Sequence, residues 1–274
     1  MPELTLPEVT IAYDVFGPDT GDPVVLVCGL SQPAMSWQLT VVPALTAAGY
    51  RVVTFDSRGV APSSSPPAPY TVDEMVHDTI GLLDHLGLTS VRIVGYSMGG
   101  WIAETMAFRH PGRTRAGVFI GSCNVGTSWE KAVTTVERDL ARLDLPLPAW
   151  FNAVETLRYL PNHELQQDSV VDDWMALLGA LEPWDNPGRL GQYEAALAWS
   201  LDVERTKRWP SLVSPCLVLS FEHDVDSPPA RARQAAEMIP GARFVEVAGA
   251  SHLGVFTHAD RVVSEILDFF AGTP

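Results

Sequence analysis

The sequence predicts an α/β protein: a mostly parallel central sheet flanked by helices and interrupted by a helical lid insertion. Short apolar runs alternate with helical patterns from residue 24 to residue 122, which is typical of a parallel sheet covered by helices. The alternation stops after residue 122 and resumes after residue 212. With 274 residues, 46% of them hydrophobic, the chain is long enough for one large core. We therefore expect a core formed by residues 1–122 and 213–274, with a lid inserted at 123–212.

Each expected element follows from its local pattern. The apolar runs predict parallel strands at 24–28, 51–56, 91–96 and 117–121, and Val9–Tyr13 predicts an antiparallel edge strand. Apolar residues at helical spacing predict helices at 35–48, 71–87 and 98–110. Within the insertion, similar patterns predict helices at 129–143, 150–160 and 170–181. Strand-like runs at 216–220 and 243–247 and a closing helix at 261–270 complete the expected core.

A candidate nucleophile lies between the strand expected at 91–96 and the helix that follows it. The residues there are Gly95-Tyr-Ser-Met-Gly99, and Gly-x-Ser-x-Gly between a strand and a helix is typical of a nucleophile elbow. The turn is so tight that side chains two residues either side of the serine would collide. Ser97 is therefore the candidate.

A serine hydroxyl needs a base to accept its proton and an acid to orient that base. The strand expected at 216–220 ends in a loop that holds Glu222, Asp224 and Asp226, and the next strand ends in Gly249-Ala-Ser-His-Leu253. Because His252 follows a late strand in a loop of small residues, it is the preferred base. The chain order is thus serine, acid, histidine. The competing histidines lack this context: His77, His85, His110, His163, His223 and His258. Of these, His110 and His258 are more simply explained as surface residues.

Taken together, these segments resemble the α/β-hydrolase fold superfamily, over essentially the whole chain. Val24-Val-Leu-Val-Cys-Gly-Leu30 resembles the strand and oxyanion turn that precede the elbow, and Phe55-Asp-Ser-Arg-Gly-Val-Ala-Pro-Ser63 resembles the family's Asp-x-Arg-Gly-x-Gly-x-Ser loop. The resemblance implies a triad of Ser97, Asp224 and His252. It also implies an oxyanion hole formed by the backbone amides of Leu30 and Met98.

Several residues near the expected site need a choice between roles. Asp224 is preferred to Asp226 as the acid by its distance from the strand and from Pro228. Asp56 and Arg58 are interpreted as structural, because such residues brace this loop in the resembling family. The chain departs from that family in two places, with Cys28-Gly29 where relatives often have His-Gly, and Ala61-Pro62 where glycine usually recurs. These changes concern the polarity of the pocket rather than the chemistry.

The composition excludes several classes of partner. A net charge of −15 opposes binding to nucleic acid and to anionic lipid surfaces. The N-terminus lacks the pattern of a signal peptide, and no segment is long and apolar enough for a membrane span. Three widely spaced cysteines fit free thiols in a reducing compartment, so we expect a cytoplasmic protein. No Cys/His cluster has the spacing of a metal site, and we expect no cofactor.

The insertion is rich in tryptophan, with six of the chain's eight: Trp129, Trp150, Trp174, Trp184, Trp199 and Trp209. Any single one is more simply explained as packing within the lid, but the set predicts an apolar wall and a hydrophobic small-molecule substrate. The residues that we assign to the substrate pocket are Cys28, Ser31, Trp37, Trp101, Trp129 and Trp150.

The function that we expect is hydrolysis of an ester, thioester or lactone through an acyl-enzyme. The same residues would also serve acyl transfer, cyclisation, carbon–carbon bond cleavage or perhydrolysis, and the fold does not choose among them. A ligand-binding protein that uses the pocket without turnover is the alternative from another class. The sequence leaves the acyl group, the leaving group and the oligomeric state open.

Overall fold

The computed structural model describes residues 1–124, 126–143, 149–180 and 187–273. These residues form an eight-stranded sheet in the order β1-β2-β4-β3-β5-β6-β7-β8. The strands are β1 (Glu3–Thr5), β2 (Thr10–Phe16), β3 (Pro23–Val27), β4 (Arg51–Phe55), β5 (Val91–Tyr96), β6 (Thr114–Ile120), β7 (Cys216–Phe221) and β8 (Arg243–Val247). β1 and β2 are antiparallel to their neighbours, and the strands from β4 to β8 pair in parallel. The predicted α/β fold is confirmed.

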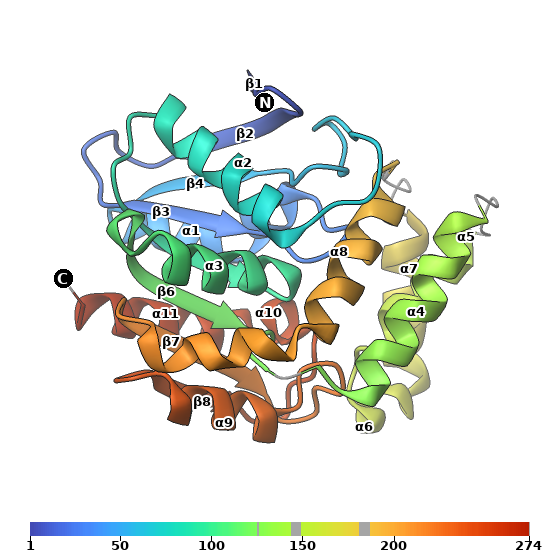
Figure 1. Cartoon of the computed structure of the whole chain (residues 1–274). Coiled ribbons are helices and arrows are strands. Elements are labelled where there is room, and N and C mark those ends of the chain that lie inside the picture. The colour runs from blue at the N-terminus through green and yellow to red at the C-terminus, as the bar shows by residue number, and fades with distance from the viewer. Residues whose placement is uncertain (125, 144–148, 181–186, 274) are drawn as a thin grey trace.

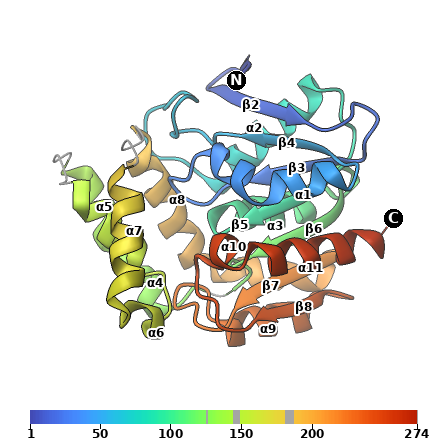
Figure 2. The same cartoon turned by 180° about the vertical axis from the view of Figure 1, so that it is seen from behind.

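Helices cover both faces of the sheet (Figures 1 and 2). α2, α3 and α9 share one apolar cluster with the sheet, and α1 and α11 share the other. The elements outside the insertion are the 3-10 helices η1 (Ala34–Leu39) and η2 (Pro111–Arg113), and the α-helices α1 (Val41–Ala47), α2 (Val72–His85), α3 (Met98–Arg109), α9 (Pro229–Met238), α10 (Gly254–Thr257) and α11 (Ala259–Ala271).

Local chemistry explains where these elements begin and end. α2 begins with a capping box, in which the Thr71 hydroxyl accepts from the Glu74 amide at 3.1 Å and the Glu74 carboxylate accepts from the Thr71 amide at 2.7 Å. The single helix predicted at 35–48 is wrong, because η1 ends at Leu39 and α1 begins at Val41. Pro43 is the reason, since proline lacks the N–H that a continuous helix needs and fits only its first turn.

The antiparallel strand predicted at Val9–Tyr13 exists as β2, but it is not at the edge of the sheet. β1 pairs along its outer side, with Leu4 opposite Ile11. The early polar residues around β1 gave no strong strand pattern, so this edge was missed. β6 begins at Thr114, three residues before the predicted start. Its first two residues, Thr114 and Arg115, are polar and do not extend the apolar run, so the sequence pattern did not include them.

Between β6 and β7 the chain leaves the sheet and forms a group of helices. They are α4 (Ser128–Arg142), α5 (Ala149–Leu157), α6 (Asn162–Leu165), α7 (Asp168–Ala180), α8 (Arg189–Leu201) and the 3-10 helix η3 (Val203–Ser211). We call α4–α8 the helical insertion. It lies beside the sheet on the side to which the arrows of β3 and β6 point (Figure 1). Its role as a lid, and the division into core and lid at 123–212, stay predictions.

The strand order positions a site at this side of the sheet. After β3 the chain adds β4 on one side, and β5 then pairs on the other side of β3. Ligands bind in α/β proteins beyond the carboxyl ends of the strands where the strand order reverses in this way. The segments that follow β3 and β5 therefore lie side by side at the point where a ligand is expected. Among the described residues, no helix is long and apolar enough to cross a membrane.

Candidate active site

Ser97 lies in a tight turn between β5 and α3. Its backbone is left-handed, with φ of 53°, a conformation that costs energy for a residue other than glycine and is typical of functional sites. A Cβ atom at Gly95 would lie 2.0 Å from the carbonyl oxygen of Gly99, and one at Gly99 would lie 2.2 Å from the carbonyl oxygen of Val27. Both glycines are therefore required by space, as the elbow pattern predicted.

A line of hydrogen bonds connects Ser97 to the two loops beyond β7 and β8. The Ser97 Oγ atom lies 3.1 Å from Nε2 of His252, and Nδ1 of His252 lies 2.7 Å from Oδ2 of Asp224. His252 and Asp224 are buried. A Cβ atom at Gly121, just after β6, would lie 3.4 Å from that Asp224 oxygen, so the acid passes directly over the end of β6. The structure brings together the three side chains that the sequence selected.

The other acids of the β7 loop make different contacts. Asp226 accepts a hydrogen bond from the indole of Trp129 at 3.0 Å, and Glu222 accepts one from the amide of Gly249 at 2.8 Å. Asp224 is further fixed by its second oxygen, which accepts from the amides of Asp226 and Ser227 at 2.9 and 2.8 Å. Among these three acids, Asp224 is thus the one that meets the imidazole.

The surroundings of His252 set its charge and its tautomer. Burial alone lowers the pKa of the imidazole, but the charge of Asp224 and its hydrogen bond, helped by Asp226 and Glu130, outweigh burial and raise that pKa. An ionised carboxylate only accepts, so Nδ1 carries the hydrogen that faces Asp224. The lone pair of Nε2 then faces the Ser97 hydroxyl. This arrangement suits a group that takes a proton from serine.

Two tyrosines that the sequence analysis did not select hold the His252 ring. The rings of Tyr96 and Tyr159 lie on it with centroids 5.2 and 5.1 Å away. The Tyr96 hydroxyl also donates to the carbonyl oxygen of His252 at 2.8 Å. Tyr96 was visible inside the elbow pattern, but Tyr159 comes from the insertion, and no local signal connects it with a histidine so far along the chain.

The turn after β3 presents its backbone to the same site. The Gly29 amide donates to the Gln32 side chain and the Ser31 amide to the Gln192 side chain, each at 2.8 Å. Among the residues that the structure describes, the amides of Leu30 and Met98 donate to no protein acceptor. These two amides follow adjacent strands, β3 and β5, and are available to a ligand.

The residues assigned to the pocket have varied surroundings. Trp37 is fully buried in the apolar cluster on the α1 face, so its assignment to the pocket is corrected, because its indole packs the core. Trp101 stacks on Trp199 at 6.1 Å. Trp129 and Trp150 are more than half exposed, and exposed indoles do not form a closed apolar wall.

Two further pocket assignments lie in the segment that directly follows the end of β3. Cys28 is fully buried, and burial together with the charge of Asp56 raises the pKa of its thiol. Ser31 is half-buried and follows Leu30 directly. The other tryptophans between residues 123 and 212 have varied surroundings too: Trp199 and Trp209 are buried around Arg205, Trp174 packs in a small cluster with Leu160, and Trp184 lies outside the described residues.

Asp56 and Arg58 take part in buried contacts away from Ser97. Asp56 accepts from the Ala34 amide at 2.7 Å, and burial raises the pKa of its carboxyl to about 6. Arg58 donates twice to Asp78, at 2.7 and 2.8 Å. Such contacts brace the loop between β4 and α2. Among the described residues, no group of three or more His, Cys, Asp or Glu side chains is arranged to hold a metal ion.

Curated relatives match the chain over nearly its full length. A protein of Mycobacterium tuberculosis named "Putative non-heme bromoperoxidase BpoC" is 31% identical, and the match covers 96% of this chain and 98% of that one. Rhodomycin D methylesterase DauP of a Streptomyces species is 26% identical, with 91% of each chain covered. Their names describe different reactions, so similarity of sequence does not by itself select one.

Solved structures also match this chain over nearly its full length. The crystal structure of BpoC superposes with a TM-score of 0.86 at 31% identity, covering 96% of each chain. The enol-lactonase of Burkholderia xenovorans superposes with a TM-score of 0.83 at 26% identity, covering 98% of this chain and all of the other. The model of the alpha/beta hydrolase family matches residues 24–265, which include the elbow, the β7 loop and His252. The chain belongs to the alpha/beta hydrolase family.

Proposed function

We propose that the protein hydrolyses an ester, thioester or lactone of a hydrophobic small molecule through an acyl-enzyme on Ser97. The observation that carries this proposal is the line of contacts from Ser97 through His252 to Asp224, at 3.1 and 2.7 Å, beside two backbone amides that are available to a ligand. A nucleophile, a base, an acid and oxyanion donors are the parts that acyl transfer to water requires.

In the first half of the reaction, the Ser97 oxygen attacks the substrate carbonyl while its proton moves to Nε2 of His252. The carbonyl oxygen becomes an oxyanion, and the amides of Leu30 and Met98 bind it. The imidazolium next to Asp224 then gives the proton to the leaving oxygen or sulfur atom. The bond to the leaving group breaks, and the acyl group stays on Ser97.

In the second half, water replaces the alcohol or thiol. His252 takes a proton from water, whose oxygen attacks the acyl carbon, and the second tetrahedral intermediate uses the same two amides. The proton returns to the Ser97 oxygen as the acid leaves. Rotation of the imidazole would break this sequence, and the ring contacts of Tyr96 and Tyr159 and the hydrogen bond to Asp224 oppose such rotation.

The proposed partner is a neutral hydrophobic molecule rather than a nucleic acid or a membrane. The negative charges of Asp226 and Glu130 both raise the pKa of His252. Negative charge around the site disfavours anionic substrates such as phosphorylated esters. We also propose that the protein acts in the cytoplasm, since its three cysteines are free.

The test is fluorophosphonate labelling with site mapping, together with release of p-nitrophenol from butyrate and octanoate esters. We expect a label on Ser97 and turnover in the wild type, and neither in Ser97→Ala. Ser122→Ala is the matched control, because this buried hydroxyl, two residues after β6, has no hydrogen-bond partner among the described residues. A folded wild type without label or turnover would refute the proposal.

Perhydrolysis is the second candidate, favoured by the 31% identity with the relative named for bromoperoxidase activity. In that reaction a carboxylic acid first acylates Ser97 and releases water, and hydrogen peroxide then attacks the acyl carbon to form a peracid. Incubation with acetate and hydrogen peroxide, followed by titration of the peracid, distinguishes the two. Peracid formation faster than ester hydrolysis would favour the second candidate.

A further inference from the structure

The start of helix α8 contacts the core closely, through Gly188 against the Gly59 backbone and Gly191 against the Tyr70 ring. The amide of Gly188, just before α8, donates to the carbonyl oxygen of Gly59 at 3.1 Å. A Cβ atom at Gly188 would lie 2.1 Å from the Gly59 Cα atom, and one at Gly191 would lie 2.6 Å from the Tyr70 ring. The start of α8 is therefore fixed against the loop between β4 and α2. Gln192 directly follows Gly191 in this helix.

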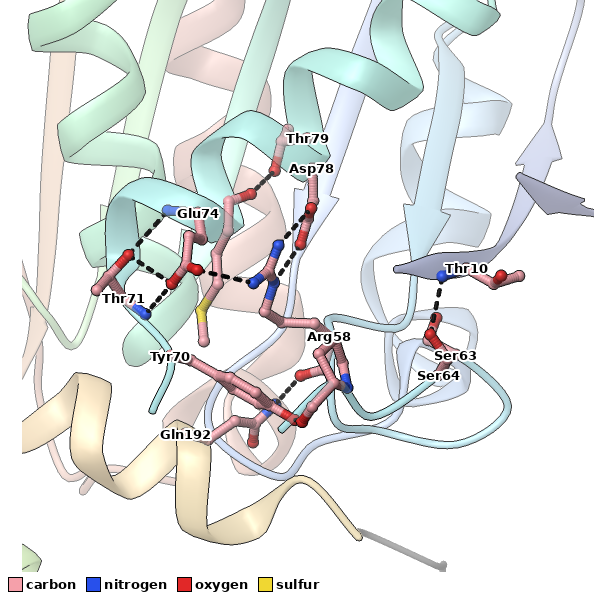
Figure 3. Close-up of polar contacts among 12 residues, drawn as sticks. Thr10, Arg58, Ser63, Ser64, Tyr70, Thr71, Glu74, Asp78, Thr79 and Gln192 are labelled. Carbon is pink, nitrogen blue, oxygen red and sulfur yellow. Dashed lines mark hydrogen bonds and ion pairs between the residues drawn. The ribbon is translucent and has the colours of Figure 1, made fainter. Parts of the chain in front are cut away.

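Gln192 is fully buried and uses both ends of its side-chain amide. Oε1 accepts from the amide of Ser31 at 2.8 Å, and Nε2 donates to the carbonyl oxygen of Arg58 at 2.9 Å. Figure 3 shows Gln192 reaching from α8 towards the loop that contains Arg58 and Tyr70. One side chain of the insertion thus connects the turn after β3 with the loop after β4.

The Arg58 end of this connection is rigid. The guanidinium is buried and donates to both oxygens of Asp78, and it also lies 3.4 Å from the Glu74 carboxylate (Figure 3). Bidentate contacts of this kind fix an arginine in one orientation. The Arg58 carbonyl therefore serves as a fixed point from which Gln192 holds the other loop.

The Ser31 end is strained and lies next to the proposed oxyanion donor. Ser31 has φ of 58°, and Ser31 and Ser97 are the two residues other than glycine with a left-handed backbone among those described. Strained residues keep their conformation only when surrounding contacts impose it. Gln192 fixes the peptide plane that carries the Ser31 amide, and Gln32 fixes the one that carries the Gly29 amide. The plane between them carries the Leu30 amide.

We propose that Gln192 is a positioning residue that aims the Leu30 amide at the oxyanion, so that the insertion helps to build the oxyanion hole. This inference rests on the proposed hydrolase function. It assigns the insertion a role beyond the predicted lid, because the geometry of one proposed oxyanion donor then depends on how α8 packs on the core. Substrate contact with Gln192 is not needed for this effect.

The experiment compares Gln192→Met, which keeps the volume and loses both hydrogen bonds, with Tyr70→Phe. Tyr70→Phe is the matched control, because it removes one hydrogen bond at the same α8 contact, to the Pro66 carbonyl at 2.7 Å, and leaves the oxyanion turn intact. Because small misplacements of reacting groups cost about 100-fold, we expect kcat for p-nitrophenyl butyrate to fall by about 10- to 100-fold in Gln192→Met. KM should stay within about twofold, since the donor acts mainly in the transition state.

A second measurement separates positioning from folding. A trifluoromethyl ketone forms a tetrahedral adduct with serine, and its inhibition constant should rise in Gln192→Met by the same factor as kcat/KM falls. Gln192→Asn, whose side chain is too short to reach both loops, should show the same loss and serves if the methionine variant does not fold. Circular dichroism and Tm report folding in each variant.

Each outcome decides the matter. Loss of kcat with unchanged KM and weaker ketone binding, at a Tm equal to that of Tyr70→Phe, supports the inference. If the wild type is active and the Gln192 variants match Tyr70→Phe in kcat and in ketone binding, the inference fails while the hydrolase proposal stands. A wild type with neither label nor turnover overturns both.

Discussion

Replacing Asp224 with asparagine tests the role of the acid without changing its shape. In the structure one oxygen of Asp224 faces Nδ1 of His252 at 2.7 Å, and the other accepts from the amides of Asp226 and Ser227. Because those two amides require an acceptor, the carbonyl oxygen of the asparagine should stay on them. The NH2 group then faces Nδ1 and donates to it.

This exchange places the histidine hydrogen on the wrong nitrogen. With Nδ1 as acceptor, Nε2 carries the hydrogen and no longer accepts the proton of Ser97. A loss of about 10⁴-fold in kcat is typical for such a change, equivalent to about 5.5 kcal/mol at 1.36 kcal/mol per tenfold. A hydrogen bond to a charged group contributes about 1.5–3 kcal/mol. The part of the lost transition-state stabilisation that this hydrogen bond does not account for is the cost of the wrong histidine tautomer.

The pH profile gives an independent readout. The base must be neutral, so activity is lost as the pH falls through the pKa of His252, which lies above its ordinary value of 6.5. In Asp224→Asn the two largest contributions that raise this pKa, the charge and the hydrogen bond of Asp224, are lost, while burial, which lowers it, remains. The acid limb of kcat/KM should therefore move to lower pH while the plateau falls.

The assay is p-nitrophenyl butyrate hydrolysis from pH 5 to 9, and the matched control is Asp226→Asn. That variant removes one charge from the same loop but keeps an acceptor for Trp129. Its kcat/KM should stay within about threefold of the wild type, roughly 0.6 kcal/mol. Equal losses in the two variants, or an acid limb that stays in place in Asp224→Asn, would refute the reasoning.

Two further predictions concern stability. Gly95→Ala places a Cβ atom 2.0 Å from a backbone oxygen of the helix that follows, so it should lower the free energy of unfolding by about 3 kcal/mol or more in urea denaturation. Gly112→Ala, with open space around it, is the control, and equal effects of the two would contradict this account. Asp78→Asn removes the bidentate partner of the buried Arg58 and leaves it the partly exposed Glu74 carboxylate at 3.4 Å, so it should cost about 3 kcal/mol. Thermal unfolding checks this against Asp73→Asn, whose ion pair is exposed and should cost under about 1 kcal/mol.

The sequence predicted the parts of the site that have local signatures. The elbow glycines are fixed by space within a few residues of Ser97, and His252 follows a strand in a loop of small residues. Pro43 is also a local signal, but the prediction of one helix at 35–48 did not use it. The chain forms two helices there, η1 and α1. Strand β1 was missed because three residues with little burial carry too weak a pattern.

The remaining parts of the site depend on contacts between distant segments. Gln192 is one glutamine on a helix, and nothing near it in the sequence shows that it binds the Ser31 amide, which precedes it by 161 residues. Tyr159 reaches His252 in the same way. Tryptophan content showed only that large rings are present. Trp37 is buried in the core whereas Trp150 is exposed, and composition carries no information on that difference.

The two left-handed serines give these observations a common physical meaning. Ser31 and Ser97 follow adjacent strands, and each is a chain neighbour of one proposed oxyanion donor, Leu30 and Met98. Backbone strain of this kind costs about 1–3 kcal/mol per residue, so surrounding contacts must offset it: the Ser97 amide donates to Ile120 at 2.9 Å, and the Ser31 amide to Gln192. Donors that are fixed in advance need no reorganisation when the oxyanion forms. Backbone strain thus lowers stability at the two turns where the proposed catalysis needs fixed amides, and one of the contacts that offset this strain comes from the insertion.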